Sequence, residues 1–90
     1  MAIEIDPKFA EAYNYRGTAY ANRDQHDRAI SDYSKAIALN LKFAMAYNNR
    51  AVSYYFEKKH DKAQHDVHKA QSLGYQVHPG FLNALSEALR

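Results

Sequence analysis

Ninety residues with a formal net charge of +2, no cysteine and 47% hydrophobic side chains indicate one small, ordered domain over residues 1–90. The absence of cysteine excludes disulfides, thiolate metal sites and a cysteine nucleophile. The small charge gives no electrostatic basis for a nucleic-acid partner, and no apolar run approaches the roughly 20 residues of a membrane span. With no cysteine and no signal-peptide pattern in the first residues, the cytoplasm is the favoured compartment and no membrane partner is expected.

The chain contains two similar units in tandem. Aligned without a gap, residues 6–39 and residues 40–73 are identical at fifteen positions, far more than chance allows. A period of about 34 residues is typical of solenoid proteins, in which each repeat is one unit of supersecondary structure. The identical pairs include Tyr13/Tyr47, Asn14/Asn48, Arg16/Arg50, Tyr20/Tyr54, His26/His60 and Asp32/Asp66.

Each unit predicts two amphipathic helices. Residues 12–20 place small and aromatic side chains at three- and four-residue steps, and residues 29–37 do the same after a polar break. The second unit predicts a helix over residues 43–55 and another that ends at Gly74, a residue able to adopt the left-handed conformation that closes a helix. Because the connections are short, the two helices of each unit are expected to be antiparallel.

Small residues predict where the paired helices touch. Gly17 and Ala51 lie in the first helices, and Ala29 and Ala63 lie at the matching points of the second helices. Their size allows the backbones to approach closely, while tyrosines fill the space beside them. Such a hairpin cannot bury its apolar face alone, so neighbouring units must stack.

Stacking is expected to end after the second unit. Two isoleucines in the second helix of unit one become glutamines in unit two, which removes the apolar surface that another full repeat would need. The replaced pairs are Ile30/Gln64 and Ile37/Gln71. Residues 79–89 then predict a closing amphipathic helix. Its apolar residues are Phe81, Leu82, Leu85 and Leu89.

The sequence resembles the tetratricopeptide repeat family, whose pattern places aromatic, Gly or Ala, Tyr and Ala residues at fixed points across about 34 residues. The positions that carry the resemblance are Tyr13, Gly17, Tyr20, Ala29, Tyr33 and Ala36, with Tyr47, Ala51, Tyr54, Ala63, Val67 and Ala70 in the second unit. The resemblance implies an all-α fold, a superhelical stack of antiparallel helix hairpins with about two and a half repeats. The implied division is residues 2–7 as the tail of a preceding repeat, 10–43 as repeat one, 44–77 as repeat two and 79–89 as a C-terminal closing helix.

The chain departs from the family pattern at several points. Arg16 and Arg50 replace a leucine, and we expect their stems to be buried while their guanidinium groups reach water. Leu41 and Tyr75 replace the proline between repeats. Because the chain opens in mid-repeat, we expect it to be a segment of a longer array, or to have its first edge covered by another chain.

The resemblance implies a protein–protein interaction scaffold or adaptor and not an enzyme. In the family, the first helices line a concave groove that holds a peptide or a partner helix. Asparagine amides can bond a peptide backbone, and neighbouring aromatic rings supply contact area. The alternative is that these asparagines are merely solvated. The expected peptide-binding face consists of Asn14, Tyr15, Thr18, Met45, Asn48, Asn49, Val52 and Tyr55.

Metal binding and catalysis have little support. Asp61, His65 and His68 are a weak metal candidate, because their i, i+4, i+7 spacing places three zinc-competent side chains on one helix face. That face is expected to point outward and to be solvated, so neither a metal nor a cofactor is expected. No nucleophile elbow, phosphate loop or HExxH motif occurs. The recurring acids, Asp32 and Asp66 among them, are expected to lie on exposed faces beside basic residues.

Two other kinds of partner compete with a peptide. Four lysines interleaved with aromatic residues suit single-stranded nucleic acid, but the basic excess is small and a solvated helix face is favoured. These are Lys58, Lys59, Lys62 and Lys69. The second functional hypothesis is self-association through exposed repeat edges, giving a homo-oligomer. Residues 2–9 and the closing helix are the suspected surfaces.

Overall fold

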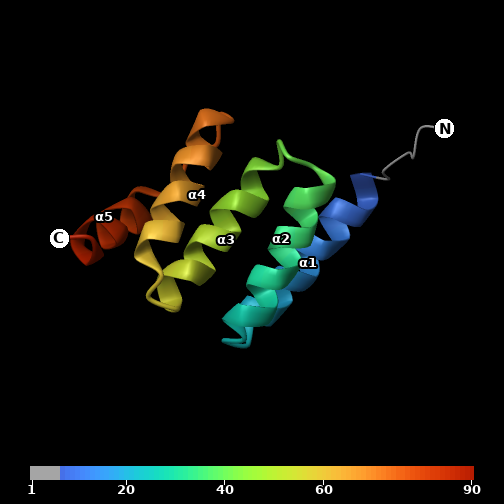
Figure 1. Ribbon diagram of the computed structural model, residues 1–90, viewed down its shortest axis with the longest axis horizontal. Helices are drawn as coiled ribbons and strands as arrows, with labels where there is room; N and C mark the ends of the chain where they lie inside the picture. Colours follow the sequence, from blue (N-terminus) through green and yellow to red (C-terminus); the bar gives the residue numbers. More distant parts are fainter. Residues whose placement is uncertain (1–6) are drawn as a thin grey trace.

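The computed structural model describes residues 7–90, which fold into five helices joined by short turns (Figure 1). The prediction of an all-α chain is confirmed, since no strand occurs between residues 7 and 90. The expected tail of a preceding repeat lies outside the described residues, except for Pro7, where α1 begins. The helices are α1 (Pro7–Asn22), α2 (His26–Leu39), α3 (Ala44–Phe56), α4 (His60–Ser72) and α5 (Pro79–Ala88).

The same tight turn separates the two helices of each pair. Asp24 and Lys58 occupy equivalent positions of the two units, and both take positive φ angles, of 59° and 62°. The next helix then has an aspartate in its first turn, Asp27 in α2 and Asp61 in α4, where a carboxylate opposes the positive end of the helix dipole. After α4 the chain turns through Gly74, whose φ of 91° is the left-handed conformation expected at that point.

The helices follow one another along the long axis of a molecule that measures 49 × 28 × 17 Å (Figure 1). α1 packs on α2 and α3 packs on α4 as two hairpins, and α2 packs on α3 to join them. This confirms the predicted stack of antiparallel hairpins. α5 lies against α4 much less closely, at the end of the molecule opposite α1 (Figure 1).

Small residues let the helices touch, as predicted. Ala29 and Ala63 are fully buried. Gly17 lies so close to α2 that a Cβ atom there would stand 2.8 Å from Cε1 of Tyr33. The Tyr33 hydroxyl oxygen lies 3.1 Å from that of Thr18. Burial raises the pKa of Tyr33, and the hydrogen bond with Thr18 offsets part of this effect.

Two ion pairs inside the hairpins correct the sequence-based expectation. Asp32 and Asp66 are not on exposed faces: both are buried. Nε and Nη2 of Arg16 donate to the two carboxylate oxygens of Asp32 at 2.7 and 2.8 Å. Arg50 binds Asp66 in the same way, at the same two distances. A carboxylate is buried only with a partner, so each arginine stays at the seam between its two helices instead of extending fully into water.

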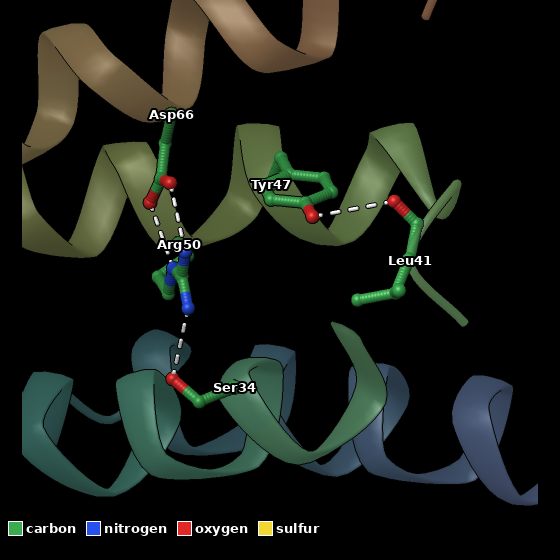
Figure 2. A network of polar contacts seen from close by, with 5 residues as sticks. All are labelled: Ser34, Leu41, Tyr47, Arg50 and Asp66. Carbon is green, nitrogen blue, oxygen red and sulfur yellow. Dashed lines mark hydrogen bonds and ion pairs between the residues drawn. The ribbon is translucent and has the colours of Figure 1, made fainter. Parts of the chain in front are cut away.

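Arg50 also reaches the neighbouring hairpin. Its Nη1 donates to Oγ of Ser34 at 3.1 Å, so one side chain links α3 to both α4 and α2 (Figure 2). At the same seam the Tyr47 hydroxyl donates to the carbonyl oxygen of Leu41 at 3.2 Å (Figure 2). The hydrogen bonds to Asp66 raise the pKa of Arg50, which keeps the guanidinium charged despite its burial.

Tyrosine rings flank both arginines. Each guanidinium lies over the negative faces of two tyrosine rings, and this cation–π arrangement adds to the attraction of the ion pair. The guanidinium carbon lies 5.5 Å from the ring centroid of Tyr13 and 6.0 Å from that of Tyr20 for Arg16, and 5.7 Å from those of both Tyr47 and Tyr54 for Arg50.

Candidate protein-binding face

Three of the eight residues of the expected binding face form hydrogen bonds within the fold. The Asn49 amide nitrogen donates to Oδ1 of Asn14 at 3.1 Å, which joins α3 to α1. Asn14 is itself buried. The Thr18 hydroxyl donates to the backbone carbonyl oxygen of Asn14 at 3.0 Å and contacts Tyr33, so it points towards α2. The two asparagines therefore join the first helices α1 and α3, and Thr18 joins α1 to α2.

The other five residues keep part of their surface. Tyr15 and Met45 are exposed, with 69% and 49% of their surface accessible. Asn48, Val52 and Tyr55 are half-buried. The structure thus leaves two of the expected contacts open to solvent and three at the edge of the core.

An aromatic cluster ties Tyr55 to the closing helix. Its ring centroid lies 5.6 Å from Phe56, 5.6 Å from Phe81 of α5 and 5.4 Å from His60 of α4. Phe56 in turn stacks on His26 of α2, with ring centroids 5.0 Å apart. Tyr55 therefore contributes to packing, while the exposed ring of Phe56 offers apolar surface beside it.

An open pocket of about 720 Å³ lies beside Asn48. Oδ1 of Asn48 is buried and accepts no hydrogen bond from residues 7–90. The equivalent atom of the first unit, Oδ1 of Asn14, accepts a bond from Asn49. The same acceptor is therefore satisfied in the first unit and unsatisfied in the second, which makes it a point where a ligand donor is favoured. The pocket is lined by Asn48, Gln71, Tyr75, Gln76, Val77, His78 and Pro79.

The turn between α4 and α5 supplies most of this lining, although no sequence pattern assigns it a binding role. Val77 is buried and fixes the turn against the core. The repeat offers one signal for the burial of Val77. Val77 is the repeat equivalent of Phe43, which packs against the same core cluster. Tyr75 and His78 carry no comparable pattern, since their position follows from the path of the turn.

Comparison with known families identifies the repeat. The model of the family described as "Tetratricopeptide repeat" matches residues 10–43, which contain most of α1 and all of α2. The unit that follows has the same hairpin, the same left-handed turn and the same arginine–aspartate pair. Residues 10–43 therefore form a tetratricopeptide repeat. A comparison with curated proteins gives no match.

Tetratricopeptide repeats are in general protein-interaction modules, and typically non-enzymatic scaffolds. Between residues 7 and 90, none of the helices combines the length and apolar character needed to cross a membrane. In the same stretch, no three His, Cys, Asp or Glu side chains gather where they could hold a metal ion. The weak candidate residues Asp61, His65 and His68 are exposed on α4 and do not form such a group.

Two of the four lysines that the sequence places among aromatic residues lie over tyrosine rings of the same chain. Nζ of Lys62 lies 5.7 Å from the ring centroid of Tyr54, and Nζ of Lys69 lies 6.0 Å from that of Tyr47. Both lysines remain exposed. Rings used in this way are not free to stack on bases, which favours the interpretation of a solvated helix face.

Proposed function

We propose that the chain binds an uncharged, extended peptide segment in the pocket beside Asn48, which is formed by α3, α4 and the turn between α4 and α5. The observation that supports this is the buried Oδ1 of Asn48, which has no donor among the described residues. An extended peptide has free backbone N–H groups, whereas a helix uses its own internally. In the proposed division of the chain, the pocket lies where repeat two (44–77) meets the closing helix (79–89).

The pocket lining favours a peptide without charge. Gln71 and Gln76 offer amide donors and acceptors, and Tyr75 offers a ring. Apart from His78, whose Nδ1 accepts a hydrogen bond from the Gly80 amide, the lining has no acid, lysine or arginine to pair with a charged ligand group. Met45, exposed on α3 one turn before Asn48, adds apolar contact area.

Peptides selected from a random library on the immobilised protein test this proposal. The selected peptide is titrated by fluorescence anisotropy against the wild type and Asn48→Ala. Loss of one hydrogen bond to the peptide is expected to raise Kd about five- to tenfold, or ~1 kcal/mol. The thermal unfolding midpoint should stay unchanged or rise, because Asn48 Oδ1 has no internal hydrogen bond to lose.

Asn14→Ala is the matched control. It removes the equivalent asparagine, but one that is buried and bonded to Asn49, so it should lower stability by about 1–3 kcal/mol. Ser31→Ala, at an exposed position on α2, should change neither binding nor stability. Selected peptides that bind Asn48→Ala as tightly as the wild type, or that are mostly charged, would contradict the proposal.

A further inference from the structure

One face of α1 is exposed where the same face of α3 is buried. The side chain of Arg16 is 55% exposed, against 18% for its equivalent Arg50. In the second unit α2 covers this face, and between residues 7 and 90 no helix takes the place of α2 on the first unit. Also exposed in α1 and buried in α3 are the positions of the pairs Ala12/Ala46 and Ala19/Ser53.

The contact between α2 and α3 shows which helix such a face binds. Ser34 of α2 accepts a hydrogen bond from Arg50 (Figure 2). Ile37 is buried in the core cluster that also contains Ala46. Ile30 lies seven residues before Ile37, two turns away on the same side of the helix, and is half-buried. The partner of this face is therefore a helix with two aliphatic residues seven apart and a hydroxyl between them.

α1 has hollows at a matching spacing. One hollow of about 220 Å³ lies at Ala12 and another of about 230 Å³ lies at Ala19, on either side of Arg16. Side chains seven residues apart on a partner helix are separated by roughly 10 Å, which is also the spacing of these two alanines along α1. No residue between 7 and 90 occupies the place of Ser34 beside Arg16.

α5 carries the same pattern as α2. Leu82, Ser86 and Leu89 have the spacing of the two isoleucines and the serine of α2. Ser86 is exposed, and the two leucines are half-buried along an open groove of about 480 Å³ between α5 and α4. His78 caps the start of α5, as His26 begins α2. The sequences around the two serines are also similar, Ser-Glu-Ala-Leu over residues 86–89 at the end of α5 and Ser-Lys-Ala-Ile over residues 34–37 in the last turns of α2.

We propose that α5 of one copy of this chain docks on the exposed face of α1 of a second copy, in the manner of α2 on α3. Leu89 fills the hollow at Ala12, and Leu82 fills the hollow at Ala19. Ser86 accepts a hydrogen bond from the guanidinium of the second copy. Because α1 and α5 lie at opposite ends of the molecule (Figure 1), the two surfaces differ, each added copy leaves one of them free, and assembly proceeds head to tail.

Sedimentation equilibrium at rising concentration tests the proposal. The wild type is expected to exceed the 10.3 kDa monomer and then the dimer as concentration rises. Ala19→Glu blocks one hollow on α1, and Ser86→Lys places an ammonium group beside Arg16. Both positions are exposed, so the fold is retained. Each variant alone is expected to associate at least about tenfold more weakly.

Mixing the two variants distinguishes a head-to-tail contact from other modes. Ala19→Glu keeps an intact α5, and Ser86→Lys keeps an intact α1 face. An equimolar mixture is therefore expected to form a 1:1 dimer that cannot grow further, because both of its remaining surfaces are blocked. Ser31→Glu is the matched control, and it should assemble as the wild type does. Ser31 is exposed on α2, and so is its equivalent in the second unit, His65. Leu89→Glu is a second variant on α5, and circular dichroism verifies the helix content of each protein.

Three results would overturn the proposal. The first is a wild type that stays monomeric up to about 1 mM. The second is a mixture of the two variants that stays monomeric although each is folded. The third is loss of assembly in Ala19→Glu with assembly intact in both Ser86→Lys and Leu89→Glu, which would indicate a symmetric contact between two α1 faces. None of these outcomes depends on peptide binding beside Asn48.

Discussion

A buried aspartate binds an arginine across each hairpin, but water reaches the two arginines to different extents. The side chain of Arg50 is 18% exposed because α2 covers it, whereas that of Arg16 is 55% exposed. If its aspartate is removed, the charge of Arg16 can be hydrated, but that of Arg50 cannot without opening the contact between the hairpins. Two ion pairs with the same geometry should therefore differ in what they contribute to stability.

Asp66→Ala is expected to lower the free energy of unfolding by about 3–5 kcal/mol, because it leaves Arg50 charged inside a buried seam. Asp32→Ala should lower it by only about 1–2 kcal/mol, because water replaces the carboxylate at Arg16. Urea unfolding followed by circular dichroism measures both changes.

A double replacement controls for the loss of side-chain volume. Leucine at positions 50 and 66 together removes both charges, and it is expected to recover most of the stability that Asp66→Ala loses. Equal losses for Asp66→Ala and Asp32→Ala would show that the contact with α2 does not shield Arg50 from water.

At the residue scale, the sequence predicts which polar residues recur but not which of them meet. Recurrence of Asp32 and Asp66 suits exposed surface pairs as well as buried ones. Their burial follows from the way two helices cross, which the periodicity of a single helix does not report. Asn14 and Asn48 illustrate the same limit, since Oδ1 of Asn14 accepts its hydrogen bond from Asn49 on the next first helix.

At the scale of elements, the two hairpins make the same contact with different side chains. Gly17 of α1 faces Tyr33 of α2, and the equivalents in the second hairpin are Ala51 and Val67. All four residues are buried. A large ring is matched by a residue without Cβ, and a smaller valine by one with a methyl group. The two pairs therefore compensate in volume.

Gly17→Ala is expected to destabilise the protein by about 1–3 kcal/mol, although alanine favours a helix by about 1 kcal/mol over glycine. The added Cβ would stand 2.8 Å from Cε1 of Tyr33, whose ring is buried, and 3.2 Å from the backbone carbonyl oxygen of Ala29. With Tyr33→Val already in place, as Val67 is in the second hairpin, the same change should cost at least about 1 kcal/mol less. A double-mutant cycle from urea unfolding measures this coupling.

Ala51→Gly is the converse control. It removes a buried methyl group from the core cluster that also contains Val67, and it should destabilise by about 1 kcal/mol or more through lost packing and added backbone freedom. Strictly additive effects of Gly17→Ala and Tyr33→Val would mean that the two side chains do not limit how closely α1 and α2 approach.

The helices themselves could be predicted because the same residue pattern occurs in both units, so each unit supports the helix assignment of the other. The small residues and Gly74 indicate where helices touch or end, and each of these features is found as expected. The placement of α5 could not be predicted in the same way. Phe81 and Leu85 predict that it has an apolar face, but the path of the turn around Val77 decides where that face lies.

At the scale of the whole molecule, the stack is held unequally along its length. α2 and α3 each pack against helices on two sides, whereas α5 packs mainly on α4 and touches α3 through Phe81. α5 is held there by buried Leu85 and by the contact between Phe81 and Tyr55. In a solenoid each element contacts only its neighbours, so a lightly held end opens before the middle does.

Native-state hydrogen exchange is expected to show this order of opening. Amides of α5 should exchange through a local opening of low free energy that is insensitive to small amounts of urea, while those of α2 and α3 should require most of the global unfolding free energy. Phe81→Ala should speed exchange in α5 about tenfold, or ~1.4 kcal/mol, because it removes the ring that contacts Tyr55. Tyr15→Ala, which removes an exposed ring on α1, should leave the rates in α5 unchanged.

The same measurement links the stability of α5 to assembly. If α5 docks on a second copy, its protection should rise with protein concentration, and that rise should be absent in Ser86→Lys. Any rise in the protection of α2 should follow only from the higher global stability that assembly gives the folded chain, because the contacts of α2 with α1 and α3 lie within one chain. Equal protection of α5 and α3 at every concentration would mean instead that the closing helix is as firmly held as the repeats, and that the chain opens only as one cooperative unit.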